Sequence, residues 1–276
     1  MNSIIDAGQL NATLASSAQS FTVIAPLDGF QFSNNFDTSE RGIRIFGANQ
    51  IIAGNINATS PPRKATTLAG FPVYLSYEQA QNQQGQNIDV LNINGEPAVN
   101  LGITASNGQV LLNTGVIDFP TNLAGALGAI QETTGQTFSI FQAALAQTET
   151  SLSGEKTIFA PTDSAFIRAG IVTTVDSAGR IDNALLRNIL NNHIVEGVFF
   201  LSDLETGTLP TIAESTITLT LGNRQTPSTL SDANEESEDA TFIPFDKYVY
   251  FGNPTNIEEL TELGVVHVVD ELLLPE

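Results

Sequence analysis

The sequence is poor in side chains that oxidise readily. Its 276 residues contain no cysteine and no tryptophan, and the single methionine is residue 1. The absence of cysteine excludes disulfides, cysteine-containing zinc sites and cysteine nucleophiles. Two explanations of this composition stay open at this point. It is either chance variation or a consequence of residence beside oxidants or oxidative enzymes.

Sequence motifs for catalysis are absent as well. There is no Gly-x-Ser-x-Gly turn, no phosphate-binding P-loop and no Gly-x-Gly-x-x-Gly after a strand-like run. The two histidines, His193 and His267, are separated by 74 residues, and this spacing does not indicate a shared metal site. We therefore predict no catalytic residue, no cofactor and no metal ion, and we favour a non-enzymatic protein.

Long apolar runs are missing too. No stretch approaches the roughly 18 apolar residues of a membrane-spanning helix. The segment Met1–Leu10 carries Asp6 and has neither a basic start nor an apolar run, so it does not resemble a signal peptide. If the protein is extracellular, we expect its signal peptide to have been removed.

Positive charge is scarce, since 10 basic residues oppose 30 acidic ones and the net charge is −20. The excess is uneven, with −4 over residues 1–121 and −16 over residues 122–276. Such a field repels phosphate groups, so nucleic acid and anionic membranes are poor partners. The acidic run Asn234–Asp239 lacks the spacing and the glycine of an EF-hand, and we expect it to be a solvated loop.

What the sequence does contain is an internal duplication. Three landmarks recur in the same order, at Ser20–Asp28, Asn49–Gly54 and Asn107–Pro120, and again at Lys156–Asp163, Asn192–Gly197 and Leu263–Pro275. A repeat of well over 100 residues is too long for a solenoid unit and has the size of a domain. We predict two domains, residues 1–121 and residues 122–276.

The second copy resembles the fasciclin (FAS1) family. The resemblance lies in the first box at Thr157–Phe166, the histidine motif at Leu190–Val195 and the second box at Gly264–Pro275. The first copy is divergent: Gln50 occupies the position of His193, and Leu111 lies near the position of His267. It also lacks the opening helix of the family, because few residues precede its first box. A function tied to the family's histidines is therefore expected in the second domain only.

The pattern of elements predicts an α+β fold. Short apolar runs stopped by proline, Phe21–Ala25 and Thr157–Ala160, are typical of buried strands. A helix capped by Asp182 is expected to end near Asn192, and strands are expected at Thr216–Leu221, Lys247–Phe251 and Val265–Val269. Strands and helices without regular βαβ alternation favour α+β. The resemblance implies two tandem domains, each a compact β-sheet wedge or sandwich with helices packed around it.

Three residues are candidates for ligand binding, namely His193, Asp163 and His267. Each has a structural alternative. His193 is interpreted as a buried, hydrogen-bonded histidine, and Thr162 or Asp163 as the cap of a helix that starts at Ser164. His267 alternates with valines and is predicted to lie on the exposed face of a strand. Two Asn-x-Thr triplets make Asn11 and Asn57 candidates for glycosylation, which suits a secreted protein.

Two functions from different classes stay open. The resemblance implies a secreted or cell-surface glycoprotein that binds an extracellular glycan or a protein surface in adhesion or cell-wall association. The amide-rich segment Gln79–Asn87 suits weak polar contacts of that kind. The alternative is a dirigent-like or cyclase-like auxiliary that assists a laccase in coupling a phenolic small molecule in fungal secondary metabolism. A deep apolar pocket favours the auxiliary, and a convex polar surface favours adhesion.

Overall fold

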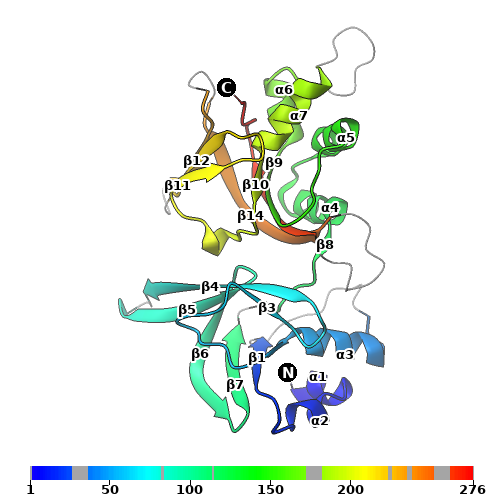
Figure 1. The fold of residues 1–276 in the computed structure, drawn as a ribbon, viewed down its shortest axis with the longest axis vertical. Helices are drawn as coiled ribbons and strands as arrows, with labels where there is room; N and C mark the ends of the chain where they lie inside the picture. The colour runs from blue at the N-terminus through cyan, green and yellow to red at the C-terminus, as the bar shows by residue number, and fades with distance from the viewer. Residues whose placement is uncertain are drawn as a thin grey trace. The chain divides into compact units, whose positions relative to one another are not determined.

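The computed structural model describes residues 2–26, 37–81, 84–113, 115–171, 182–222, 226–234, 238–251 and 262–275. The chain divides into two compact units, Met1–Phe119 and Pro120–Glu276. Figure 1 shows each unit as a sheet with helices beside it. The domain boundary that the sequence places between residues 121 and 122 stays a prediction.

The first unit consists of short helices and a sheet. Its helices are α1 (Asn2–Ala7), α2 (Asn11–Leu14) and α3 (Glu40–Asn49), and its strands are β1 (Phe21–Pro26), β2 (Ile51–Ala53), β3 (Lys64–Thr66), β4 (Pro72–Gln81), β5 (Asn87–Ile93), β6 (Glu96–Ala105) and β7 (Gly108–Asn113). Helix α3 begins at its cap Ser39, whose hydroxyl accepts the N–H of Gly42. In place of the opening helix that the sequence analysis finds missing, two short helices, α1 and α2, precede β1 among the described residues.

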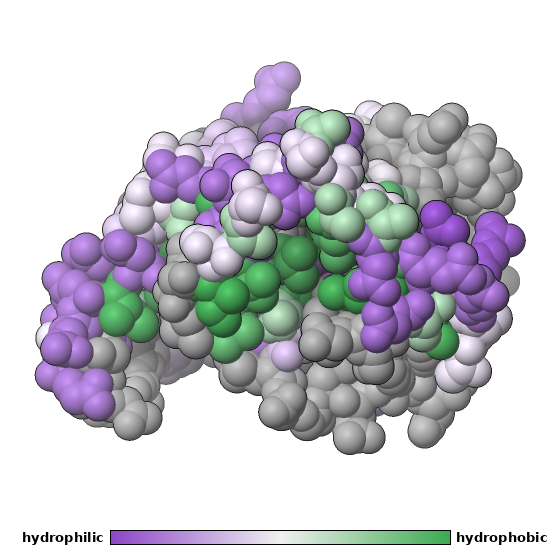
Figure 2. Space-filling model, turned by 90° about the horizontal axis from the view of Figure 1, so that it is seen from below, coloured by the Kyte–Doolittle hydropathy of each residue, from purple (hydrophilic) through white to green (hydrophobic). Residues whose placement is uncertain are grey.

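The sheet of the first unit has the strand order β2-β1-β7-β6-β5-β4-β3, and β1 and β7 run parallel. One face carries the main core, which includes Ile24, Leu91 and Leu111, all fully buried. The opposite face of β1 packs on the helices through a smaller cluster that includes Leu10, Phe21 and Ala48. Seen from below, hydrophobic side chains gather near the middle of the face that Figure 2 shows, with hydrophilic side chains on either side.

The second unit has fuller helices. They are α4 (Leu123–Thr134), α5 (Ser139–Thr148), α6 (Asp163–Arg168), α7 (Asn183–Asn192) and the 3₁₀ turn η1 (Leu201–Asp203). Its strands are β8 (Thr121–Asn122), β9 (Lys156–Pro161), β10 (Ile194–Glu196), β11 (Gly207–Pro210), β12 (Thr216–Thr220), β13 (Ser228–Ser231), β14 (Ala240–Tyr250) and β15 (Leu263–Val269). Asp182 caps α7 through the N–H of Ala184, as the sequence predicts. None of the described helices is long and apolar enough to cross a membrane.

Two cores lie on opposite faces of this second sheet. The helices α4 to α7 cover one face, where Ile158 and Val266 are buried (Figure 1). On the other face, Phe159, Phe242 and Val269 pack with residues of β12 and β13. Every residue of β15 is buried, because the sheet is covered on both faces.

The two units share one topology. The second sheet has the order β10-β9-β15-β14-β13-β12-β11, which repeats the order of the first sheet strand for strand, and β8 pairs with β14. Both parallel pairs have the same register, since Gly108 lies opposite Phe21 and Gly264 lies opposite Lys156. A Cβ added at Gly108 would lie 2.0 Å from the carbonyl oxygen of Phe21, and a Cβ added at Gly264 would lie 2.4 Å from the carbonyl oxygen of Lys156. The predicted α+β fold is confirmed.

Candidate functional site

His193 lies at the C-terminal end of α7 and is fully buried. Its Nε2 accepts the backbone N–H of Leu273 at 2.9 Å, so its Nδ1 carries the proton and donates to the carbonyl of Ile189 at 2.8 Å. Burial lowers the pKa of His193 to about 4, and the bond to Ile189 opposes this shift only in part. The imidazole is therefore neutral near pH 7 and joins the end of α7 to the closing segment of the unit.

The residue before His193 completes this connection. Asn192 donates from Nδ2 to the carbonyl of Leu273 at 3.1 Å, and its Oδ1 accepts the hydroxyl of Thr211 at 3.2 Å. We call the bonds made by Asn192 and His193 to Leu273 the closing network. Both side chains are almost fully buried, so these bonds satisfy polar groups that have no access to water.

The first unit contains the same closing network with glutamine in place of histidine. Asn49 donates to the carbonyl of Ile117 at 2.8 Å and accepts the hydroxyl of Thr67 at 3.1 Å. Gln50 accepts the N–H of Ile117 at 2.8 Å and donates to its carbonyl at 3.1 Å. Because an uncharged amide performs the same task, the closing network explains the position of His193 without a ligand.

Asp163 caps a helix other than the one predicted. Thr162 caps α6 through the N–H of Ala165, whereas Asp163 is the first residue of that helix. The Asp163 carboxylate accepts the N–H of Ile140 and the hydroxyl of Ser139, both at 2.7 Å, and so caps the start of α5 from outside. Burial acts to raise the pKa of Asp163, but these hydrogen bonds outweigh it and lower the pKa.

The prediction that His267 lies on an exposed face is wrong. The side chain is fully buried, and its ring stacks on Phe159 at 5.5 Å and packs on Phe242 at 5.1 Å between ring centres. Its Nε2 donates to the carbonyl of Phe199 at 2.7 Å. Alternation implies an exposed face only where one face of a sheet meets water, and here a core covers each face.

The structure does not gather the three candidates into one site. His193 and His267 are inside the second unit, and Asp163 lies at the start of α5. None of the three lines the cavities described below. Their role in ligand binding stays a prediction, and the described residues contain no group of three or more His, Asp or Glu side chains that could hold a metal ion.

Both glycosylation candidates are on the surface. Asn11 is the first residue of α2, is exposed, and donates to the Asp6 carboxylate at 2.6 Å. Asn57 is exposed in a loop, where its Oδ1 accepts the N–H of Thr59 at 3.1 Å. Glycosylation at either residue stays a prediction. In the acidic run, Glu235, Glu236 and Ser237 lie outside the described residues.

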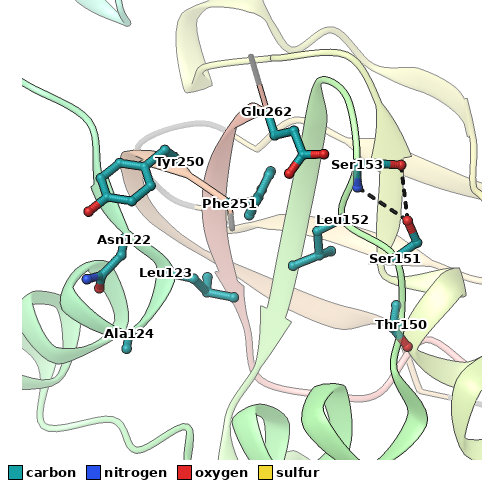
Figure 3. A pocket seen from close by; sticks show the side chains of 10 residues that line it. All are labelled: Asn122, Leu123, Ala124, Thr150, Ser151, Leu152, Ser153, Tyr250, Phe251 and Glu262. Carbon is teal, nitrogen blue, oxygen red and sulfur yellow. Dashed lines mark hydrogen bonds between the residues drawn. The ribbon is translucent and has the colours of Figure 1, made fainter. Parts of the chain in front are cut away.

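A cavity of about 630 Å³ opens in the second unit. Three segments far apart in the sequence line it, at the start of α4, in the loop between α5 and β9, and at the ends of β14 and β15 (Figure 3). The lining residues are Asn122, Leu123, Ala124, Thr150, Ser151, Leu152, Ser153, Tyr250, Phe251 and Glu262.

The chemistry of this cavity is mixed. In Figure 3, Leu123 and Leu152 point toward the middle of the cavity beside Phe251, and polar groups surround them. Ser151 and Ser153 are linked by a hydroxyl–hydroxyl bond of 3.0 Å. The cavity therefore combines apolar side chains with hydroxyl, amide and carboxylate groups, an arrangement that suits a neutral ligand with polar substituents.

Sequence reasoning missed this cavity. Its residues are mostly neutral, common in proteins and contributed by segments more than 100 residues apart, from Asn122 to Tyr250. They form no motif, and only the fold brings them together. The hydroxyl-rich stretch Thr150–Ser153 is the one signal in the sequence, and such stretches are also typical of ordinary loops.

Comparison with known proteins identifies one family. Residues 136–275, a little over half of the chain, match the family model described as the fasciclin domain. A solved structure similar to this chain is the FAS1 domain pair of the insect cell adhesion molecule Fasciclin I, with 15% identity and a TM-score of 0.37. That match covers 99% of this chain and 95% of the other. No curated protein matches the sequence.

Proposed function

We propose that this chain, which belongs to the fasciclin domain family, is a non-enzymatic protein that binds extracellular glycans weakly in adhesion or cell-wall association. Proteins with this domain are typically extracellular or at the cell surface. The observation that carries the proposal is the cavity of the second unit, with apolar side chains at its middle and polar groups around them.

A sugar ring matches this arrangement in two respects. Its C–H faces are apolar and pack on side chains such as Leu123, Leu152 and Phe251. Its hydroxyl groups can donate to the Glu262 carboxylate, and they can donate to or accept from the Tyr250 hydroxyl. Strong affinity is not expected, because each neutral hydrogen bond contributes only about 0.5–1.5 kcal/mol once water is displaced.

Weak single sites work in adhesion when many of them act together. Linked binding sites raise avidity by a factor of about 10²–10⁴ without any new contact. We therefore expect the isolated protein to bind soluble oligosaccharides in the millimolar range, and protein displayed densely on beads to be retained on the corresponding insoluble polysaccharide.

The experiment compares the wild type with Glu262→Gln and Tyr250→Phe, which remove a charge and a hydroxyl from the cavity while leaving its shape. The control is Glu205→Gln, which makes the same chemical change at an exposed residue outside the cavity. Ligand-observed NMR with β-glucan and chitin oligosaccharides is expected to show weaker binding for the two cavity variants and unchanged binding for the control. Equal binding by all four proteins, or none by the wild type, contradicts the proposal.

A second candidate function is the laccase auxiliary. It is supported by the size of the same cavity, about 630 Å³, which falls within the roughly 300–1,000 Å³ typical of small-molecule sites. Its leucine and phenylalanine side chains suit a phenolic ring. Purified protein added to a laccase reaction on polyketide phenols is then expected to change the stereochemistry or the product ratio and to form no product alone. Unchanged products together with retention on cell-wall material contradict this candidate.

A further inference from the structure

Among the described residues, one sheet face in the first unit has less helical cover than the same face of the second unit. In the second unit, Ile158 and Ala160 of β9 and Val266 and Val268 of β15 share one face, and all four are fully buried. They pack against residues of α4, α5 and α7. The register of the duplicated strands identifies the corresponding residues of the first unit as Val23, Ala25, Val110 and Leu112.

None of these four corresponding residues is fully buried in the first unit. The difference has a direct cause in the sequence, because α4 and α5 have 12 and 10 residues whereas α1 and α2 have 6 and 4. Ile103, which pairs with Val110 on the same face, leaves 46% of its surface exposed.

These partly covered strands form one wall of a cavity of about 290 Å³. Helices α1 and α2 contribute Ile5 and Leu14 to it, and the strands contribute Phe21, Val23, Ala25 and Val110. We propose that this cavity is a binding site for a small, uncharged, largely apolar molecule, distinct from the mixed polar and apolar cavity of the second unit.

The polar residues at this cavity do not favour a polar ligand. The amide of Asn107 already donates to the carbonyls of Leu14 and Ser16, at 2.7 and 2.9 Å. The amide of Gln109 donates to the carbonyl of Ile56 at 2.5 Å. No charged side chain is among the described residues that line the cavity. Burial of apolar surface is therefore the main driving force available to a ligand.

The volume sets the size of the ligand. An apolar protein cavity of about 150 Å³ holds benzene, which corresponds to about 25 Å³ for each non-hydrogen atom. A cavity of about 290 Å³ accordingly holds about 12 such atoms. Bicyclic aromatic rings and short aliphatic chains have this size.

Indole is a suitable probe, because it has the required size and carries no charge. The chain contains no tryptophan, so excitation at the red edge of the indole band reports the ligand without protein background. We expect indole emission to shift to shorter wavelength when the full-length wild-type protein is added, with saturation as its concentration rises. Wild-type protein that produces no shift at millimolar indole overturns the proposal.

Two variants fill the cavity from neighbouring strands. Ala25→Phe adds six carbon atoms, about 150 Å³ on the same scale, and leaves less space than indole needs. Val110→Phe fills the cavity from β7 and guards against a folding defect specific to the first variant. The control is Ala146→Phe, at an exposed position of α5 in the second unit. We expect each filling variant that retains the wild-type circular dichroism to bind indole at least tenfold more weakly, and the control to bind normally. Unchanged binding by a folded filling variant overturns the proposal.

Discussion

Replacing His193 by glutamine is expected to make the second unit less sensitive to acid. His193 has a pKa of about 4 in the folded protein, against an ordinary value of 6.5. Between these pH values the unfolded chain binds a proton at this residue and the folded chain does not. The stability that depends on neutral His193 is therefore complete above pH 6.5 and is lost as the pH falls toward 4.

The loss follows from the size of the pKa shift. Each unit of pKa difference corresponds to about 1.4 kcal/mol, so a shift from 6.5 to about 4 costs about 3 kcal/mol at pH 4. Glutamine has no such cost, because it does not titrate. Gln50 shows that glutamine fits this position, since it bonds both backbone groups of Ile117 in the first unit.

The assay is urea unfolding of wild type and His193→Gln, followed by circular dichroism at several pH values from 7 to 4. Taking the difference between the two proteins cancels the titration of the other groups. We expect His193→Gln to gain about 3 kcal/mol relative to the wild type over this range. The mirror variant Gln50→His is expected to add the same acid sensitivity to the first unit. A difference between wild type and His193→Gln that does not change with pH refutes the reasoning.

Substitutions at four further positions test the packing of the second unit by the same unfolding measurement. Asp163→Ala is expected to cost about 0.5–2 kcal/mol at pH 7 through loss of the α5 cap. Because hydrogen bonds lower the pKa of folded Asp163, this cost should shrink as the pH falls through the folded pKa, and a cost that does not change on acidification would contradict the capping role. Gly264→Ala should cost about 1–3 kcal/mol, since its Cβ would lie 2.4 Å from a backbone oxygen. Gly128→Ala in α4, where an added Cβ has no atom within 4 Å, should stabilise the protein by up to about 1 kcal/mol. Changes in unfolding free energy of the same sign for both variants would contradict this. Thr157→Val should cost about 1–3 kcal/mol because the hydroxyl bonds two backbone groups, at 2.8 and 2.9 Å, and Thr157→Ser should restore most of it.

The elements with strong local signals were predictable from the sequence. Phe21–Ala25 and Thr157–Ala160 are strands, because each is a β-prone apolar run ended by proline. Asp182 caps the helix that ends at Asn192, since a short carboxylate side chain before an amphipathic stretch favours a helix start. The duplication also predicted that corresponding segments have corresponding folds, and the common strand order agrees with this.

Elements that depend on pairing between strands were not predictable in this way. The segment Gln79–Asn87 reads as a polar surface stretch, yet Gln79 and Gln81 belong to β4 and pair with Asp89 and Asn87 of β5. Backbone hydrogen bonds between the strands stabilise this pairing, and side-chain hydropathy does not reveal it. The face of His267 was mispredicted for a related reason, because the second core that covers it comes from strands elsewhere in the sequence.

The parallel pair in each sheet has a consequence for how the chain folds. Thr22 pairs with Gln109, 87 residues later, and Thr157 pairs with Val265, 108 residues later. Contacts of such long sequence separation form slowly, because the entropy of closing the loop is lost before the pairing compensates for it. During synthesis, β1 and β9 each have an unpaired edge until the last strand of their unit has been synthesised. Such edges are templates for intermolecular pairing, so a chain interrupted before β15 is expected to aggregate, and chaperone binding should concentrate in the interval before that strand appears.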